Sequence, residues 1–262
     1  MAFCRTFVFP ALLLAACSSH GLDVVGLAPG SLGDMVAYWP CDEGSGGTLL
    51  DHSGYGYNGS ILGATWLLDS GHAGFGGALH FDSGNSVIVG SFPNATDSWS
   101  VSLWVRPSSW APPAANSGDS YVTLISTEVV FSGGWEMNVR FPELERTWRY
   151  HFAYPTTGDA GSYYAYDEAN GFDVGLWTHL VAVVDSSSSA MQILFYKNGV
   201  LSTEKAITDL IQPGSDALYL GTWSGGGRYF VGDLDDIVIY GRALVPAEIG
   251  ALYANPAPSN LH

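Results

Sequence analysis

The stretch that decides the fold is 230–249, FVGDLDDIVIYGRALVPAEI, near the carboxyl end of the chain. Its first half alternates with the two-residue period of a β-strand, and both faces carry apolar side chains. We therefore expect a strand that is covered on both sides, as in a sandwich of two sheets. The alternation places Asp233 and Asp235 on the same face as Ile237 and Ile239.

The second half of this stretch has the period of a helix. Pro246 fits the first helical position, and Ile249 and Leu252 lie on one face. Glu248 can supply one half of a capping box, whereas Val245 replaces the Ser or Thr that the other half needs. We expect a short helix that begins less firmly than one with a complete box.

The composition favours one all-β domain. The chain has 262 residues, of which 47% are apolar, 33 are Gly and 13% are charged, which suits many short strands joined by turns. The formal net charge of −16 argues against partners that are nucleic acids and against binding to anionic lipid headgroups. It is compatible with a surface protein and with sites for divalent cations.

The first residues read as a targeting segment. The apolar run 7–16 is too short to span a bilayer, and it ends in Leu14-Ala15-Ala16-Cys17, which resembles a bacterial lipobox. This predicts a signal peptide over 1–16, lipidation of Cys17 and a tether over 17–34. The alternative is an ordinary secretory signal cut near Ala16. Because Ser rather than Asp follows Cys17, we expect secretion across the inner membrane and a lipid anchor in the outer membrane.

The cysteines exclude a disulfide framework within one molecule. Cys4 leaves with the signal and Cys17 would be acylated, so Cys41 has no partner. We expect Cys41 to be a small buried apolar residue, and the protein to be a monomer that contacts the membrane only through its lipid anchor.

Further strands are expected at 121–127, 135–140, 147–154 and 217–222, and Asn198-Gly199 predicts a type I′ hairpin turn. The Gly- and Tyr-rich stretch 156–172 has no assignable pattern, and we expect it to be a loop that sets ligand specificity.

Five segments resemble, in order, the motifs of LamG-like jelly-roll domains in the concanavalin A-like superfamily. They are MVAYWPCDEGSGG with DHSGYGYNG in 35–59, GGALHFDSGNSVIV in 76–89, WSVSLWVRP in 99–107, GLWTHLVAVVD with LFYKNG in 175–199, and the stretch 230–249. The resemblance covers 35–254 and leaves 255–262 as a tail. It implies an all-β fold, a two-sheet antiparallel jelly-roll sandwich with a short C-terminal helix.

Acidic and amide side chains near the expected first and last strands suggest a calcium site. Jelly rolls of this superfamily often hold an ion where the first and last strands meet, which here suggests Asp42, Asp82, Asn85 and Asp235 as metal ligands. The alternative needs no metal: Asp235 accepts hydrogen bonds from turn amides near Asp42 or Gly84.

Aromatic residues in expected loops could stack on sugar rings. Trp110, Tyr163, Tyr164 and Trp223 are the candidates for ligand binding. For each of them, the alternative is a packed anchor of its loop.

Signs of catalysis are weak. The chain lacks the E-x-D-x-x-E pattern of related glucanases, the G-x-S-x-G of serine hydrolases and HExxH, and His179 is expected to be structural. We expect a non-catalytic cell-surface binding or adhesion module for a glycan or a protein. The alternatives are a polysaccharide hydrolase or lyase and a purely structural envelope lipoprotein.

Overall fold

The computed structural model describes residues 34–72, 76–94, 97–109, 121–129, 133–140, 147–154, 161–166, 173–207 and 214–254. The expected signal peptide, Cys17, nearly all of the tether, Trp110 and the tail lie outside these ranges. Among the helices within them, none has both the length and the apolar character needed to cross a membrane.

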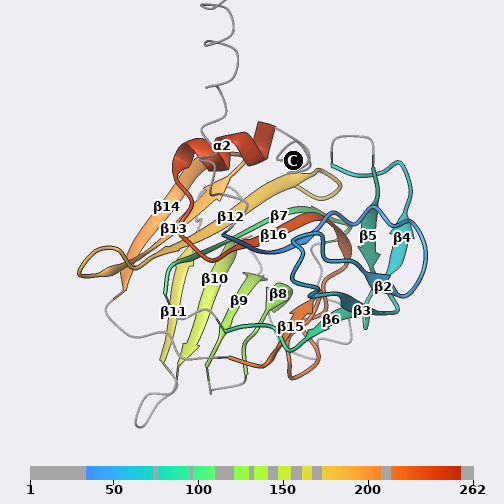
Figure 1. Cartoon of the computed structure of the whole chain (residues 1–262), viewed down its shortest axis with the longest axis horizontal. Coiled ribbons are helices and arrows are strands. Elements are labelled where there is room, and N and C mark those ends of the chain that lie inside the picture. The colour runs from blue at the N-terminus through green and yellow to red at the C-terminus, as the bar shows by residue number, and fades with distance from the viewer. Residues whose placement is uncertain are drawn as a thin grey trace, which may run out of the picture.

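The described chain forms two antiparallel sheets with one helix (Figure 1). Sheet A has the order β14-β13-β12-β7-β16-β5-β4, and β1 also pairs with β16. Its strands are β1 (Met35–Trp39), β4 (Thr65–Leu67), β5 (Ala78–Phe81), β7 (Trp99–Pro107), β12 (Thr178–Asp185), β13 (Met191–Lys197), β14 (Val200–Ile207) and β16 (Gly232–Tyr240).

Sheet B has the order β11-β10-β9-β8-β15-β6-β3-β2. Its strands are β2 (Thr48–Leu49), β3 (Gly59–Leu62), β6 (Ser86–Gly90), β8 (Tyr121–Ser126), β9 (Trp135–Arg140), β10 (Thr147–Tyr154), β11 (Gly161–Tyr166) and β15 (Ala217–Leu220). The helix is α2 (Pro246–Ala254). The predicted two-sheet sandwich with a short C-terminal helix is confirmed.

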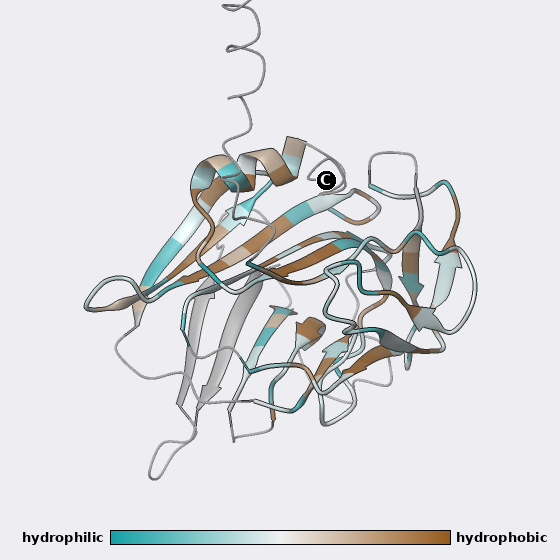
Figure 2. Cartoon of the chain, viewed as in Figure 1, coloured by the Kyte–Doolittle hydropathy of each residue, from teal (hydrophilic) through white to brown (hydrophobic). Residues whose placement is uncertain are grey.

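The main core lies between the sheets, and the two-residue strand period builds it. In β9, Trp135 and Met137 belong to the core while Glu136 and Asn138 face the other way. Cys41 is fully buried in the same core and is not in a disulfide, as predicted. Figure 2 shows the apolar segments that line the strands of both sheets.

A second, smaller core lies under α2, on the side of sheet A that faces away from sheet B (Figure 1). Ile249 and Leu252 of the helix pack there against side chains of β12, β13 and β16. Glu248 Oε2 accepts from the backbone N–H of Val245 at 3.0 Å, which is the half of the capping box that the sequence offers. Arg242 adds two hydrogen bonds of 2.7 Å to the Glu248 carboxylate and so ties the start of α2 to the end of β16.

A β-bulge in β16 changes which residues face the main core. The pairing with β7 shifts between Asp235 and Val238, and Asp236 has a φ of 41°. Leu234 and Ile237 therefore both reach the main core, and Asp235 faces outward beside its register partner Trp104. The prediction that Asp235 shares a face with Ile237 was wrong, because a bulge inserts one residue into the alternation.

The unassigned stretch 156–172 contains a strand, β11, which is paired to β10 along its whole length. Tyr163 and Tyr164 thus lie in a strand rather than in a loop, contrary to expectation. Their segment GSYYAY has no apolar–polar alternation, so only the pairing partner reveals it. The predicted type I′ turn is confirmed, since Asn198 and Gly199 have φ values of 50° and 76°.

Candidate functional site

A buried carboxylate lies on the outer face of sheet B, the face turned away from the main core. Glu136 of β9 is fully buried although it points outward. Its Oε1 accepts a hydrogen bond from the Thr123 hydroxyl, and its Oε2 lies 2.9 Å from Nη1 of Arg228. A buried carboxylate needs such partners, because an unpaired charge away from water is costly.

Arg228 comes from the connection 221–231 between β15 and β16, which folds over this face. The backbone N–H of Thr123 donates to the Arg228 carbonyl at 2.7 Å, which fixes the loop on β8. The Arg228 guanidinium lies 4.2 Å from the ring centroid of Trp223 and 5.1 Å from that of Tyr121. Cation–π contacts of this kind hold the guanidinium in one orientation.

Trp223, a predicted ligand-binding residue, is thus part of the loop that carries Arg228. Its Nε1 donates to the Gly226 carbonyl at 2.7 Å, and a Cβ added at Gly225 would lie 2.8 Å from its ring. These contacts give Trp223 the role of an anchor for Arg228. Stacking of Trp223 on a sugar stays a prediction.

Asn138 lies two residues from Glu136 on the same outward side of β9. It is 1% exposed, and its Oδ1 has no hydrogen-bond partner in the part of the chain that the structure describes. A buried acceptor of this kind costs about 1–3 kcal/mol when nothing bonds to it.

The backbone register links a predicted tyrosine to this face. Tyr164 of β11 pairs with His151 of β10, which pairs with Glu136. Tyr163 lies in the neighbouring row of paired residues, which includes the core residue Trp135. Of the two predicted tyrosines, Tyr164 therefore shares the row of the buried carboxylate.

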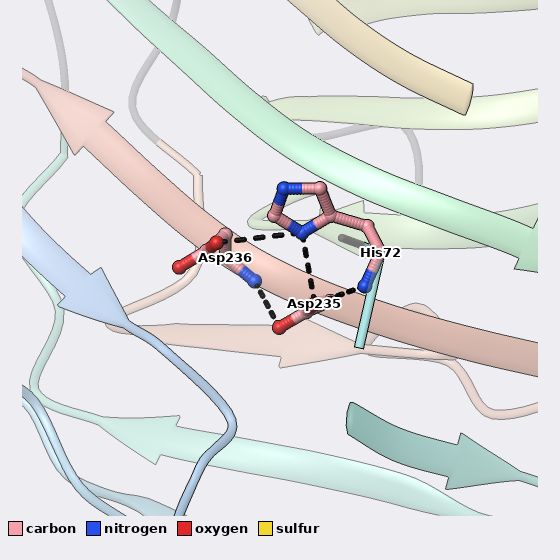
Figure 3. A group of neighbouring side chains, drawn as sticks. All are labelled: His72, Asp235 and Asp236. Carbon is pink, nitrogen blue, oxygen red and sulfur yellow. Dashed lines mark hydrogen bonds and ion pairs between the residues drawn. The ribbon is translucent and has the colours of Figure 1, made fainter. Parts of the chain in front are cut away.

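A second polar cluster lies on the outer face of sheet A and consists of His72, Asp235 and Asp236 (Figure 3). His72 Nδ1 is 3.0 Å from Asp235 Oδ2 and 3.5 Å from Asp236 Oδ2. The His72 backbone N–H also donates to Asp235 Oδ2, at 2.9 Å. The Tyr38 hydroxyl donates to the other oxygen of Asp236 at 2.7 Å.

The electrostatics of this cluster follow from burial. Burial first, and then the charge of Asp235, raise the pKa of Asp236 to about 8, against the opposing effect of the Tyr38 hydrogen bond. Burial and the Asp236 charge also raise the pKa of Tyr38 far above its ordinary value, so this hydroxyl remains a donor.

The four residues predicted to bind calcium, which are Asp42, Asp82, Asn85 and Asp235, each have their own hydrogen-bond partners or exposure. Asp42 accepts from the backbone N–H of Gly77 at 2.5 Å. Asp82 is in the turn after β5 with its side chain 74% exposed, and its carbonyl accepts from the N–H of Asn85 at 3.0 Å. Asp235 accepts hydrogen bonds from His72 and from the backbone N–H of Asp236, rather than from the turn amides near Asp42 or Gly84 that the sequence suggested.

The donor atoms around Asp235 fit calcium poorly, because Ca²⁺ prefers oxygen ligands and His72 presents a nitrogen. Among the described His, Cys, Asp and Glu residues, the group whose ligand atoms lie within 4.8 Å of one another consists of His72, Asp235 and Asp236. Asp42 and Asp82 are outside it. His72 was missed from the sequence, since the segment around it has no metal-binding spacing. Calcium at the four predicted residues stays a prediction.

His179 is a packed, structural histidine, as predicted. It is 1% exposed, and its Nε2 lies 2.8 Å from the Ser102 hydroxyl. Burial, and to a lesser degree the charge of His72, lower its pKa to about 3. A neutral imidazole is therefore built into the outer face of sheet A.

The family and the solved structures that this chain resembles agree with the fold. The model of the family described as "Concanavalin A-like lectin/glucanases superfamily" matches residues 81–250. Domain 4 of AbnA, a GH43 extracellular arabinanase from Geobacillus stearothermophilus in complex with arabinotriose, is 19% identical with a TM-score of 0.62, over 84% of this chain and 98% of that one.

Botulinum neurotoxin domains are similar as well. The type G receptor binding domain is 19% identical with a TM-score of 0.57, over 84% of this chain and 51% of that one. A structure of botulinum neurotoxin type C, a toxin whose cell entry is described as dependent upon interaction with two ganglioside molecules, is 15% identical with a TM-score of 0.60. That match covers 86% of this chain and 52% of the toxin chain. This chain spans about half the length of those toxin chains. At these identities, the shared property is the fold.

Proposed function

Because this chain belongs to the concanavalin A-like lectin/glucanases superfamily, we propose that it is a non-catalytic module that binds a glycan on the outer face of sheet B. The observation that carries the proposal is the buried Glu136–Arg228 pair beside the unpartnered Oδ1 of Asn138. The guanidinium of Arg228 reaches solvent and offers donors to sugar hydroxyls, while the buried Glu136 carboxylate holds it in place.

The way Arg228 is held supports binding. Its side chain is 17% exposed, so the guanidinium reaches solvent while it contacts Glu136, Trp223 and Tyr121. A guanidinium that is already ordered loses little conformational entropy when a ligand binds, which favours affinity. The fold also suits this role, since a domain of the same architecture is described with arabinotriose.

Binding of the purified full-length chain to immobilised oligosaccharides, including arabinotriose and ganglioside headgroups, tests the proposal. Arg228→Lys keeps the charge but loses the fork of donors, and we expect it to weaken glycan affinity at least tenfold while the chain still folds. Glu204→Ala, at an exposed position of sheet A, is the matched control.

Equal affinity of Arg228→Lys and the natural chain would place the site elsewhere. Binding to a surface protein with no glycan binding would favour the protein-binding alternative. Release of reducing sugar would show the hydrolase alternative.

The cell-surface location is a separate proposal. We infer from the lipobox-like end of the apolar run that Cys17 is acylated and anchors the module in the outer membrane. Labelling of expressing cells with an alkyne fatty acid should mark the natural chain and not Cys17→Ser. Release of an unlabelled natural chain into the medium would instead indicate an ordinary secretory signal.

A further inference from the structure

We propose that His72, Asp235 and Asp236 form a site for a divalent metal ion of the zinc class on the outer face of sheet A. This site lies on the opposite sheet from the proposed glycan site, so the two proposals stand or fall independently.

The donor atoms converge at the right spacing. One imidazole nitrogen faces one oxygen of each carboxylate, at 3.0 Å from Asp235 and 3.5 Å from Asp236 (Figure 3). A tetrahedral zinc ion with bonds of about 2.0–2.1 Å separates its ligand atoms by roughly 3.3 Å. All three ligand atoms lie within 4.8 Å of one another, which leaves them on one side of a position that an ion could take.

The charge at this site calls for a cation. The side chains of Asp235 and Asp236 are 5% and 11% exposed, and both carboxylates contact the one imidazole of His72. Two carboxylates that lie this close together away from water are costly to bury, and a cation between them would lower that cost. A dication would balance both.

The donors are also held in place before any ion arrives. The bulge in β16, with Asp236 at a φ of 41°, turns two consecutive carboxylates to the same side of the strand. The Asp236 backbone N–H holds Oδ1 of Asp235 at 2.8 Å, and the Tyr38 hydroxyl holds Oδ1 of Asp236. In each carboxylate, the second oxygen faces His72. Outer partners of this kind orient ligands in metal sites.

The donor set selects the class of metal. Imidazole nitrogen with carboxylate oxygen suits Zn²⁺, Co²⁺ or Mn²⁺, whereas Ca²⁺ and Mg²⁺ prefer oxygen alone. Three protein ligands would leave a fourth position for water or for a donor group of a bound molecule. Since His72 lies outside β16, the ion would also tie the segment around His72 to β16, the last strand along the chain.

Calorimetry and thermal unfolding of the full-length chain, stripped with a chelator and given Zn²⁺, Co²⁺ or Ca²⁺ separately, test this. We expect one Zn²⁺ per chain, a melting temperature that rises with Zn²⁺, and a visible Co²⁺ absorption band typical of four-coordinate nitrogen and oxygen ligands. His72→Gln should weaken Zn²⁺ binding at least tenfold and abolish the Co²⁺ band. His52→Gln, at an exposed histidine, should change neither.

Asp236→Asn is the second variant, because it keeps the shape of the side chain and removes one charge. It should fold in the presence of chelator and show a weakened response to Zn²⁺. Undiminished Zn²⁺ binding in both His72→Gln and Asp236→Asn would overturn the proposal. So would a melting temperature that rises with Ca²⁺ and not with Zn²⁺, a result that would favour the oxygen site predicted from the sequence.

Discussion

His72 lies flat against Trp104, with ring centroids 4.0 Å apart and ring planes within 13°. Trp104 also stacks on Tyr253 of α2, with centroids 5.7 Å apart, so one ring contacts both segments that cover the outer face of sheet A. The tryptophan thus connects the cluster of His72, Asp235 and Asp236 to the helix.

Truncation of Trp104 should therefore destabilise the whole outer layer of sheet A. We expect Trp104→Ala to lower the free energy of unfolding by about 3–5 kcal/mol, because the ring is 8% exposed and its loss leaves a cavity. Urea unfolding measures this. Leu68→Ala, at a side chain that is 66% exposed, should stay within about 0.5 kcal/mol of the natural chain. If Trp104→Ala lowers the free energy of unfolding no more than Leu68→Ala does, Trp104 does not stabilise the outer layer of sheet A.

The pair of Glu136 and Arg228 should respond unequally to the loss of either partner. Arg228→Ala leaves a fully buried carboxylate without its guanidinium, and we expect a loss of about 3 kcal/mol. Glu136→Gln should cost less, because Arg228 is partly exposed and keeps its aromatic contacts. The double variant should then be more stable than Arg228→Ala alone. Equal losses of unfolding free energy in Arg228→Ala and Glu136→Gln would show that the unpaired buried charge of Glu136 is not the main cost.

His179 should make the protein sensitive to acid. Its pKa is about 3 in the folded chain and about 6.5 when unfolded, so the unfolded state binds more protons between these values. The contribution of neutral His179 to the free energy of unfolding is therefore fully present above pH 6.5. It falls as the pH is lowered, by about 2 kcal/mol at pH 5. The groups that face it are the Ser102 hydroxyl, the Tyr253 and Trp104 rings and, through its charge, His72.

Urea unfolding at pH 7 and pH 5 checks this for the natural chain and for His179→Gln, with chelator present in both. The variant should lose less stability on acidification than the natural chain. Parallel losses in the two proteins would mean that the folded protein tolerates a protonated His179.

Asp51 should hold the opening turn of the domain. Its carboxylate accepts from the backbone N–H groups of Tyr38, Ser53 and Tyr57 at 3.0, 2.9 and 2.9 Å, and these bonds lower its pKa despite partial burial. We expect Asp51→Ala to cost about 2 kcal/mol at pH 7, because three amides lose their acceptor.

The cost of Asp51→Ala should shrink as the pH falls through the lowered pKa of Asp51, where the natural carboxylate takes up a proton. Thermal unfolding across pH measures it, with Glu204→Ala as the exposed control. A cost that stays constant down to pH 2 would contradict a charge-dependent role.

Much of the fold could be predicted from sequence because strand period, turn chemistry and core composition are local properties. The alternation in β7, the Asn198-Gly199 turn and the helix after Pro246 each depend on neighbouring residues. The burial of Cys41 and His179 follows from the apolar strands around them. Pairing partners are not local, which is why β11 could not be assigned.

The amino-acid sequence by itself determined that this chain is an acidic two-sheet sandwich with a terminal helix, because period and turn signals need only a few adjacent residues. The tertiary structure alone decided which polar residues meet. A bulge of one residue put Asp235 and Ile237 on opposite faces of the strand. The packing of the segment around His72 brought this residue, 163 positions away in the chain, onto the Asp235 carboxylate. The loop 221–231 likewise placed Arg228 over Glu136, 92 positions earlier in the chain. Such contacts depend on how the sheets and loops pack, and no spacing in the sequence encodes them.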